Sequence, residues 1–159
     1  MARMGSFDAS QMRKLQQNLD KLQGADIDAF CEECAKELAA RLLAKVIKRT
    51  PVGQYPAGLG KKGGTLRRGW TSQNSSGGNT SAKKAVESLR VQHIGDKYVI
   101  EIVNPVEYAS YVEYGHRTRN HKGWVAGQFM MTISEQEVQT IAPKVLENKL
   151  KKFLGGAFQ

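Results

Sequence analysis

Residues 104–118, NPVEYASYVEYGHRT, are the most informative run of side chains that can do chemistry in this sequence. Glu107 and Glu113 are carboxylates, and His116 follows in the same run. Side chains of these types act as general acids and bases when neighbouring groups orient them. The alternative is a docking element, which only has to hold a shape. The helix predicted for this run distinguishes the two.

The signals at both ends of the run predict a helix over 105–114. Asn104 is a suitable N-cap, Pro105 fits the first helical position, and Glu107 stands where it can complete a capping box. Gly115 stands where a left-handed residue commonly ends a helix.

On that helix the two carboxylates do not converge. Glu107 and Glu113 are six positions apart, which is about 600° around a helix. Tyr108, Tyr111 and Val112 project together instead. We therefore predict a docking helix without an acid/base pair, in which Glu113→Gln leaves stability nearly unchanged.

A metal site can be imagined from the two cysteines, Cys31 and Cys34, with His116 and His121 as further zinc ligands. Both cysteines fall instead within an apolar stripe at helical spacing, where a free cysteine is a small buried hydrophobe. The stripe consists of Ile27, Phe30, Cys31, Cys34, Ala35, Leu38, Leu42 and Val46. We expect no metal and no cofactor.

Other enzyme signatures are missing. Gly58 and Gly60 lack the flanking strand and helix of a phosphate-binding loop, and no serine lies in a nucleophile elbow. His93 falls in a predicted strand, which favours a structural role. His116 and Arg117 beside Tyr114 are the remaining option, a small basic nuclease. The sequence predicts a protein that is not an enzyme.

The elements that position these residues follow from the apolar periodicity. Helices are predicted over 9–23 and 27–48, with a C-terminal helix to about 153 that Pro143 kinks or breaks. Its start is either near Phe129 or at a capping box formed by Ser134 and Glu137.

Strands are predicted for TLRRGWT (65–71), VESLRVQHI (86–94) and KYVIEIV (97–103), with Gly95-Asp96 as a type II′ turn between the last two. The expected fold class is α+β. A long N-terminal helix and the kinked C-terminal helix pack on a small antiparallel sheet of three or four strands, with long basic Gly-rich loops. Residues 1–24 form an N-terminal helical extension, and 25–159 form a single domain.

The chain is strongly basic, with a net charge of +9. Between Leu38 and Val86 there are ten Lys and Arg residues and no Asp or Glu. Basic side chains in glycine-rich backbone can contact phosphates without sequence specificity. The candidate DNA-facing residues are Lys61, Lys62, Arg67 and Arg68, and solvated surface is the alternative. No apolar run is long enough to span a bilayer, and the start does not resemble a secretory signal.

Three motifs occur in order: RTPVG…GGTLRRGW, VNPVEYASYVEYGHRT, and GWVAGQFMMTISEQE before a Lys-rich helix. Together they resemble the small tail-component family of tailed bacteriophages, the tail-completion or head–tail joining proteins near lambda minor tail protein Z. The resemblance covers about residues 27–154. An insert at about 53–63 departs from the family's pattern, in which Thr-Pro-Val is closely followed by Gly-x-Leu-Arg.

The resemblance implies a non-enzymatic protein of the virion neck, which completes the tail or joins it to the head. It implies a homo-oligomeric ring around the DNA channel, assembled in the host cytoplasm, with other neck and tail proteins as partners. The basic loops then face neighbouring subunits or genomic DNA, and a non-specific nucleic-acid-binding module is the alternative function. The candidate subunit or docking contacts are Leu66, Trp70, Tyr108, Tyr111, Val112, Gly115 and Arg117.

Overall fold

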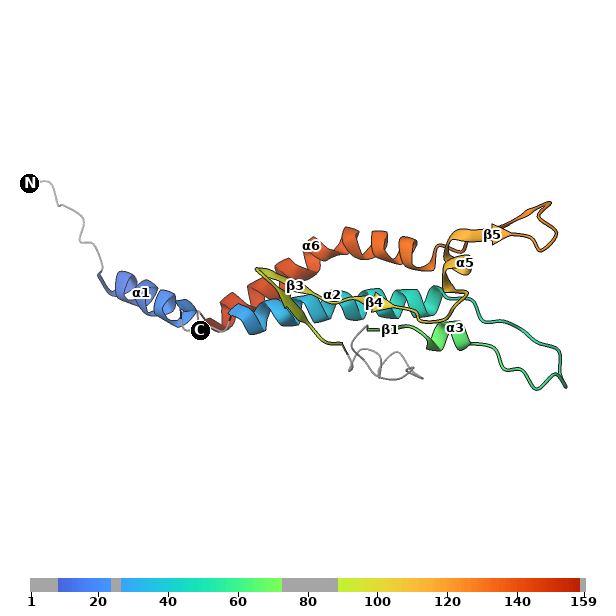
Figure 1. Ribbon diagram of the computed structural model, residues 1–159. Helices are drawn as coiled ribbons and strands as arrows, with labels where there is room; N and C mark the ends of the chain where they lie inside the picture. Colours follow the sequence, from blue (N-terminus) through green and yellow to red (C-terminus); the bar gives the residue numbers. More distant parts are fainter. Residues whose placement is uncertain (1–8, 24–26, 73–88, 158–159) are drawn as a thin grey trace, which may run out of the picture.

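The computed structural model describes residues 9–23, 27–72 and 89–157 (Figure 1). Its body consists of two long helices that lie side by side and run in opposite directions, α2 (Ile27–Arg49) and α6 (Met130–Ala157). A third helix, α1 (Ala9–Gln23), projects from the end of the body where α2 begins and α6 ends. The predicted first two helices are confirmed, and α6 continues beyond its expected end.

The remaining elements are short. Two further helices are α3 (Thr65–Arg68) and α5 (Ala109–Tyr114). The strands are β1 (Thr71–Ser72), β2 (Gln92–Ile94), β3 (Lys97–Val99), β4 (Ile102–Val103), β5 (Gly115–Arg117) and β6 (Trp124–Ala126). In the described part of the chain they pair antiparallel as β1–β4, β2–β3 and β5–β6.

The α+β class is confirmed, but the strands form separate two-stranded pairs rather than one sheet of three or four strands. The run 97–103 divides because β3 pairs with β2 whereas β4 pairs with β1. Gly95 and Asp96 form the predicted turn: Ile94 pairs with Lys97, and φ is +62° at Gly95. Residues 86–88 of the predicted strand and the 73–81 tract lie outside the described residues.

The β2–β3 hairpin is fastened to α2 by two polar contacts. His93 Nε2 lies 2.8 Å from Glu32 Oε1, which supports the structural role expected of this histidine. Tyr98 donates its hydroxyl hydrogen to the Asp28 carboxylate, and this bond raises the pKa of Tyr98 to about 12. The hairpin therefore covers the first half of α2.

The core lies nearer the other end of α2. Ala39, Leu43 and Val46 are buried there. They pack with Leu66, Trp70, Leu89 and Met130. The stripe predicted from the sequence is therefore partly wrong. Ile27 is exposed and Leu38 and Leu42 are half-buried, because contact with both α6 and α3 rotates the buried face to positions 39 and 43.

The cysteine half of α2 packs more loosely. Cys31 and Cys34 are half-buried free thiols, and burial raises the pKa of Cys34. Phe30 stacks on Phe153 of α6, with ring centroids 4.5 Å apart. Within the described residues, no group of three or more His, Cys, Asp or Glu side chains is placed to hold a metal ion.

Ion pairs join α2 to α6. Lys45 Nζ lies 2.7 Å from Glu137 Oε2, and Arg49 Nη2 lies 2.6 Å from Glu137 Oε1. These hydrogen bonds lower the pKa of Glu137. Arg49 also donates to Ser134, whose hydroxyl donates to the Met130 carbonyl. Of the two possible starts of this helix, the earlier one near Phe129 is confirmed, and the capping box at Ser134 and Glu137 is wrong, since both residues lie inside a helix that begins at Met130.

Pro143 does not end α6, which continues through it to Ala157. Figure 1 shows that the ribbon of α6 bends along its length, in line with the kink expected at a proline. None of the helices in the described part is long and apolar enough to cross a membrane.

The start of α6 depends on a residue from α5. Phe129, just before the helix, has a positive φ of 48° and no side-chain oxygen to cap it. The Glu113 carboxylate accepts hydrogen bonds from Met131 N and Thr132 N, both at 2.9 Å, and from Thr132 Oγ1 at 2.8 Å. Glu113 is only 6% exposed. The expectation that Glu113 has no part in stability is therefore wrong.

A second polar cluster joins the end of α2 to α3. Thr50 is fully buried, and its hydroxyl donates to Val46 O and accepts from Trp70 Nε1 at 2.6 Å. Arg67 Nε and Nη2 donate to Thr50 O at 3.1 and 2.6 Å. Residues Thr50, Arg67 and Trp70 are called the Thr50 cluster below. Residues 65–71, predicted as one strand, instead form α3 followed by β1. In this conformation the Arg67 guanidinium points back toward Thr50.

Asn104 does not cap a helix. Its Nδ2 donates to Leu66 O at 2.8 Å, and its Oδ1 accepts from Val106 N at 3.2 Å. The predicted helix 105–114 is correspondingly shorter, because α5 begins only at Ala109 and Tyr108 precedes it without a side-chain cap. Asn104 instead fastens α3 to the segment before α5.

Glu113→Gln is expected to destabilise the fold by about 1–3 kcal/mol, because the amide offers an N–H where the carboxylate accepts from a helix N–H. Urea unfolding measures the effect. Glu107→Gln, at an exposed position, is the control and should stay within about 0.5 kcal/mol of the parent. Equal stability of the two variants would contradict the capping role.

Candidate functional site

Two arms extend in the same direction beyond the end of the α2–α6 body (Figure 1). The first arm, residues 51–64, connects α2 to α3. The second arm, residues 115–127, contains β5 and β6 and connects α5 to α6. The two arms and α5 between them are called the arm end. The arms come from distant parts of the sequence, yet both begin at residues that the buried polar contacts fix.

The first arm is closed at its base and open along its length. Every side chain from 51 to 62 is exposed. Near the tip, Gly58 and Gly60 have φ of +96° and +62°, which glycine adopts without strain. At the base, Gly63 lies so close to the Gly53 carbonyl that a Cβ would not fit. Arg68 Nη1 donates to Gly63 O at 3.2 Å and supports the return of the chain.

The second arm is a β-hairpin, whereas the fold expected from the sequence had long basic Gly-rich loops. Its strands pair with His116 opposite Val125 and Arg117 opposite Trp124. The tip is held by Thr118, whose N donates to Gly123 O at 3.0 Å and whose hydroxyl donates to Asn120 Oδ1 at 2.6 Å. The turn-forming types Thr118, Asn120 and Gly123 were the signal that the sequence offered for this hairpin.

Two glycines let the second arm cross closely over α5. Gly115 has φ of +86° and ψ of 173°, so it follows α5 with a positive φ but not in the left-handed helical conformation predicted for it, and a Cβ there would meet Val125 O. Gly127 lies against the Glu113 carbonyl. The returning chain then donates from Gln128 N to Val112 O at 2.7 Å and from Phe129 N to Glu113 O at 3.0 Å. Gly115 therefore has a backbone role inside the chain.

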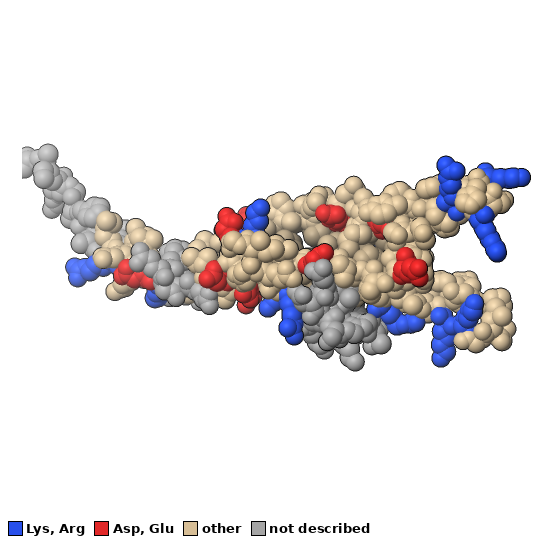
Figure 2. Space-filling model, in the orientation of Figure 1, with Lys and Arg blue, Asp and Glu red and all other residues tan. Residues whose placement is uncertain are grey.

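The charge of the two arms is positive only. Neither arm contains an Asp or Glu, and their cations are Lys61, Lys62, Arg117, Arg119 and Lys122. Figure 2 shows Lys and Arg side chains standing out from both arms. Within the described residues no carboxylate pairs with any of these five, in contrast to Lys45 and Arg49 on the body. A binding partner of the arm end must therefore tolerate or neutralise positive charge.

Aromatic side chains gather between the cations. Tyr55, Tyr108, Tyr111, Tyr114 and Trp124 are exposed at this end of the molecule. A hollow of about 310 Å³ separates the base of the first arm from α5, and Val52, Tyr55, Leu66, Tyr108 and Val112 are among its lining residues. Tyrosine, tryptophan and arginine are the types that dominate binding energy at protein interfaces. The arm end therefore has the composition of an interaction surface.

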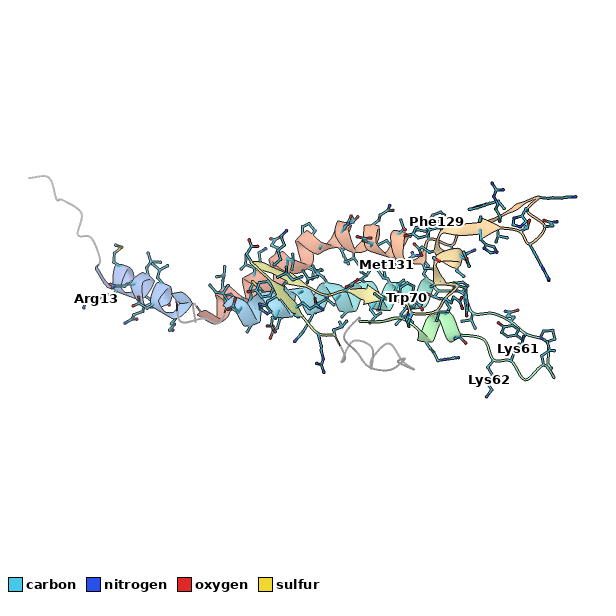
Figure 3. The ribbon with its side chains drawn as sticks, viewed as in Figure 1. Arg13, Lys61, Lys62, Trp70, Phe129 and Met131 are labelled. Carbon is cyan, nitrogen blue, oxygen red and sulfur yellow. The ribbon has the colours of Figure 1, made fainter. Side chains whose placement is uncertain are left out.

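The structure separates the candidate contact residues into two groups. Lys61, Lys62 and Arg68 are exposed, as are Arg117, Tyr108 and Tyr111, and Val112 is half-buried. Figure 3 shows Lys61 and Lys62 on the first arm and Trp70 inside the body, near the end of α2.

Leu66 and Trp70 are buried core residues, and Arg67 is half-buried and engaged with Thr50. The interpretation of Leu66 and Trp70 as docking contacts, and of Arg67 as DNA-facing, is thus replaced by an internal role. Three further residues of the second basic segment were not among the candidate contacts and complete the exposed surface: Arg119, Lys122 and Trp124.

The comparisons with known proteins give one family. The model of the family described as "Bacteriophage HK97-gp10, putative tail-component" matches residues 13–115. The chain belongs to this tail-component family. No curated protein and no solved structure matches the chain.

The tail-component match begins within α1 and ends at Gly115. It includes the first arm, the Thr50 cluster, Asn104 and Glu113. The rest of the second arm and α6 lie beyond the matched range. Several residues of the motifs on which the resemblance to a phage tail component was based make internal polar contacts, among them Thr50, Arg67, Trp70, Asn104 and Glu113.

Replacing the exposed cations should leave the tail-component fold intact. Lys61→Gln/Lys62→Gln should stay within about 0.5 kcal/mol of the parent in urea unfolding, because these side chains contact nothing that folding requires. Arg67→Gln should cost about 1–3 kcal/mol, because two hydrogen bonds from a charged donor to Thr50 O are removed. A reversed order of these two effects would contradict the division between arm and core.

Proposed function

We propose that this tail component is a structural protein of the phage neck, which completes the tail or joins it to the head as part of a ring around the DNA channel. It acts through binding and without catalysis. Membership of the tail-component family supports a place in the virion. The observation that favours a joining role is the arm end, where tyrosines and a tryptophan are exposed and cations stand out from both arms.

A binding role also fits the chemistry of the arm end. His116 and Arg117 are exposed on β5, and the His116 ring lies beside that of Tyr111, with centroids 5.7 Å apart. General acid and base catalysis requires a partner that orients the imidazole, and the arms contain no carboxylate for it. The tyrosines and cations are instead suited to covering a neighbouring protein surface.

The proposal expects Tyr108→Ser/Tyr111→Ser to block joining. Both side chains are exposed, so folding should be unaffected, while aromatic surface at the arm end is removed. Electron microscopy of particles made with this variant should show unjoined heads and tails, or aberrant tail ends.

Ile94→Ser is the matched control, since Ile94 is an exposed apolar residue on the β2–β3 hairpin, away from the arms. Particles with this control should be joined normally. Normal joining by the double tyrosine variant would show that the arm end is not the docking surface.

The second candidate function is non-specific nucleic-acid binding, favoured by the five cations of the arms, which no carboxylate in the described part of the chain neutralises. Lys61→Gln/Lys62→Gln should then weaken binding to a random-sequence DNA duplex. The slope of log K against log salt should fall by about 0.9 for each phosphate that the variant no longer neutralises. Arg13→Gln/Lys14→Gln removes the same charge from α1 and is the control. Equal effects of the two pairs would show that only net charge matters and would reject a DNA-facing first arm.

A further inference from the structure

The helix α1 carries an apolar stripe that nothing in the described chain covers. Met12, Leu15 and Leu19 are 54%, 50% and 49% exposed, although all three project from a regular helix. The helix lies beside the C-terminal end of α6 and projects away from the body (Figure 1). A short helix with an uncovered apolar face is marginal in water, because most helical stability comes from packing such a face.

The spacing of the stripe is that of a coiled coil. Met12 and Leu19 are seven positions apart, and Leu15 and Leu22 follow each of them by three. These positions correspond to a and d of two heptads, which is the narrow seam that pairs with another helix. A helix that packs on a broad core has a wider apolar face.

The residues beside the seam carry no charge. With Met12 at position a, the flanking e and g positions are Gln16, Asn18 and Gln23. The charged residues all fall at b and c, on the outer part of the helix: Arg13, Lys14, Asp20 and Lys21. Flanking charges normally select a partner of opposite sign. Uncharged flanks instead allow identical helices to approach without repulsion, in a chain whose net charge is +9.

We propose that the partner of α1 is the α1 helix of a second copy of this chain, paired along Met12, Leu15, Leu19 and Leu22. The inference deepens the homo-oligomer in the proposed function but does not depend on the neck role. Two heptads make a weak contact, which forms between free chains only at high chain concentration. The contact becomes strong when copies already stand side by side, because the effective concentration of neighbouring helices is then high.

Sedimentation of the purified full chain tests the pairing. Over roughly a hundredfold range of concentration the average mass should rise from one chain towards two or more. Leu15→Gln/Leu19→Gln should stay monomeric over the same range, and circular dichroism should confirm its fold, since glutamine is a good helix former. Leu15→Met/Leu19→Met keeps the seam apolar and should restore association.

Arg13→Gln/Lys14→Gln alters only the outer part of the helix and should associate like the parent. A parent that remains monomeric throughout would overturn the proposal, and so would a glutamine variant that associates as the parent does. Loss of head–tail joining in that variant, with a monomeric parent, would assign the seam to a different protein. If the parent associates but particles that lack the protein still join heads to tails, the neck role is wrong and the pairing remains supported.

Discussion

The first backbone N–H groups of α6 have no carbonyl partner within the helix, and the Glu113 side chain accepts hydrogen bonds from two of them, Met131 N and Thr132 N. Its negative charge also stands at the positive end of the helix dipole. Because Glu113 belongs to α5, this contact sets the position of α5 against the body. The backbone bonds to Gln128 and Phe129 then determine where the second arm returns.

The Thr50 cluster does the same for the first arm. Thr50 is the last residue before that arm, and Arg67 and Trp70 come shortly after it. Both arms thus begin and end at buried polar contacts, although their own side chains are exposed. Shape is therefore determined at the base of each arm, while binding chemistry lies along its length. A substitution in one region can leave the other unchanged.

The sequence predicted what depends on local signals. The helices α1 and α2, most of α6 and the turn at Gly95-Asp96 follow from periodicity and turn chemistry. The errors arose where a contact with a residue distant in the sequence determines the local structure. Arg67 lies in a run that looks like a strand but folds as helix, because its guanidinium reaches back to Thr50. Asn104 has the composition of a helix cap but binds Leu66 O.

Glu113 shows the same limit most clearly. Its position on the predicted helix indicated only that it does not face Glu107. Nothing in the local pattern indicated that the first turn of α6 would lie against it. The exposed part of the candidate surface was partly predictable, since Lys61, Lys62, Tyr108, Tyr111 and Arg117 were selected from charge and spacing. Leu66 and Trp70 were placed on that surface wrongly, because an apolar residue in a motif gives no sign of which side it faces.

The closed base of the first arm has a consequence for chain length. Gly53 and Gly63 lie against each other there, so the intervening residues form a loop whose two ends are close together. The entropy of closing a flexible loop grows only with the logarithm of its length, and a doubling costs about 0.6 kcal/mol. Insertions or deletions between these glycines are therefore nearly neutral for folding. The reach of the arm can change while the body that presents it stays the same.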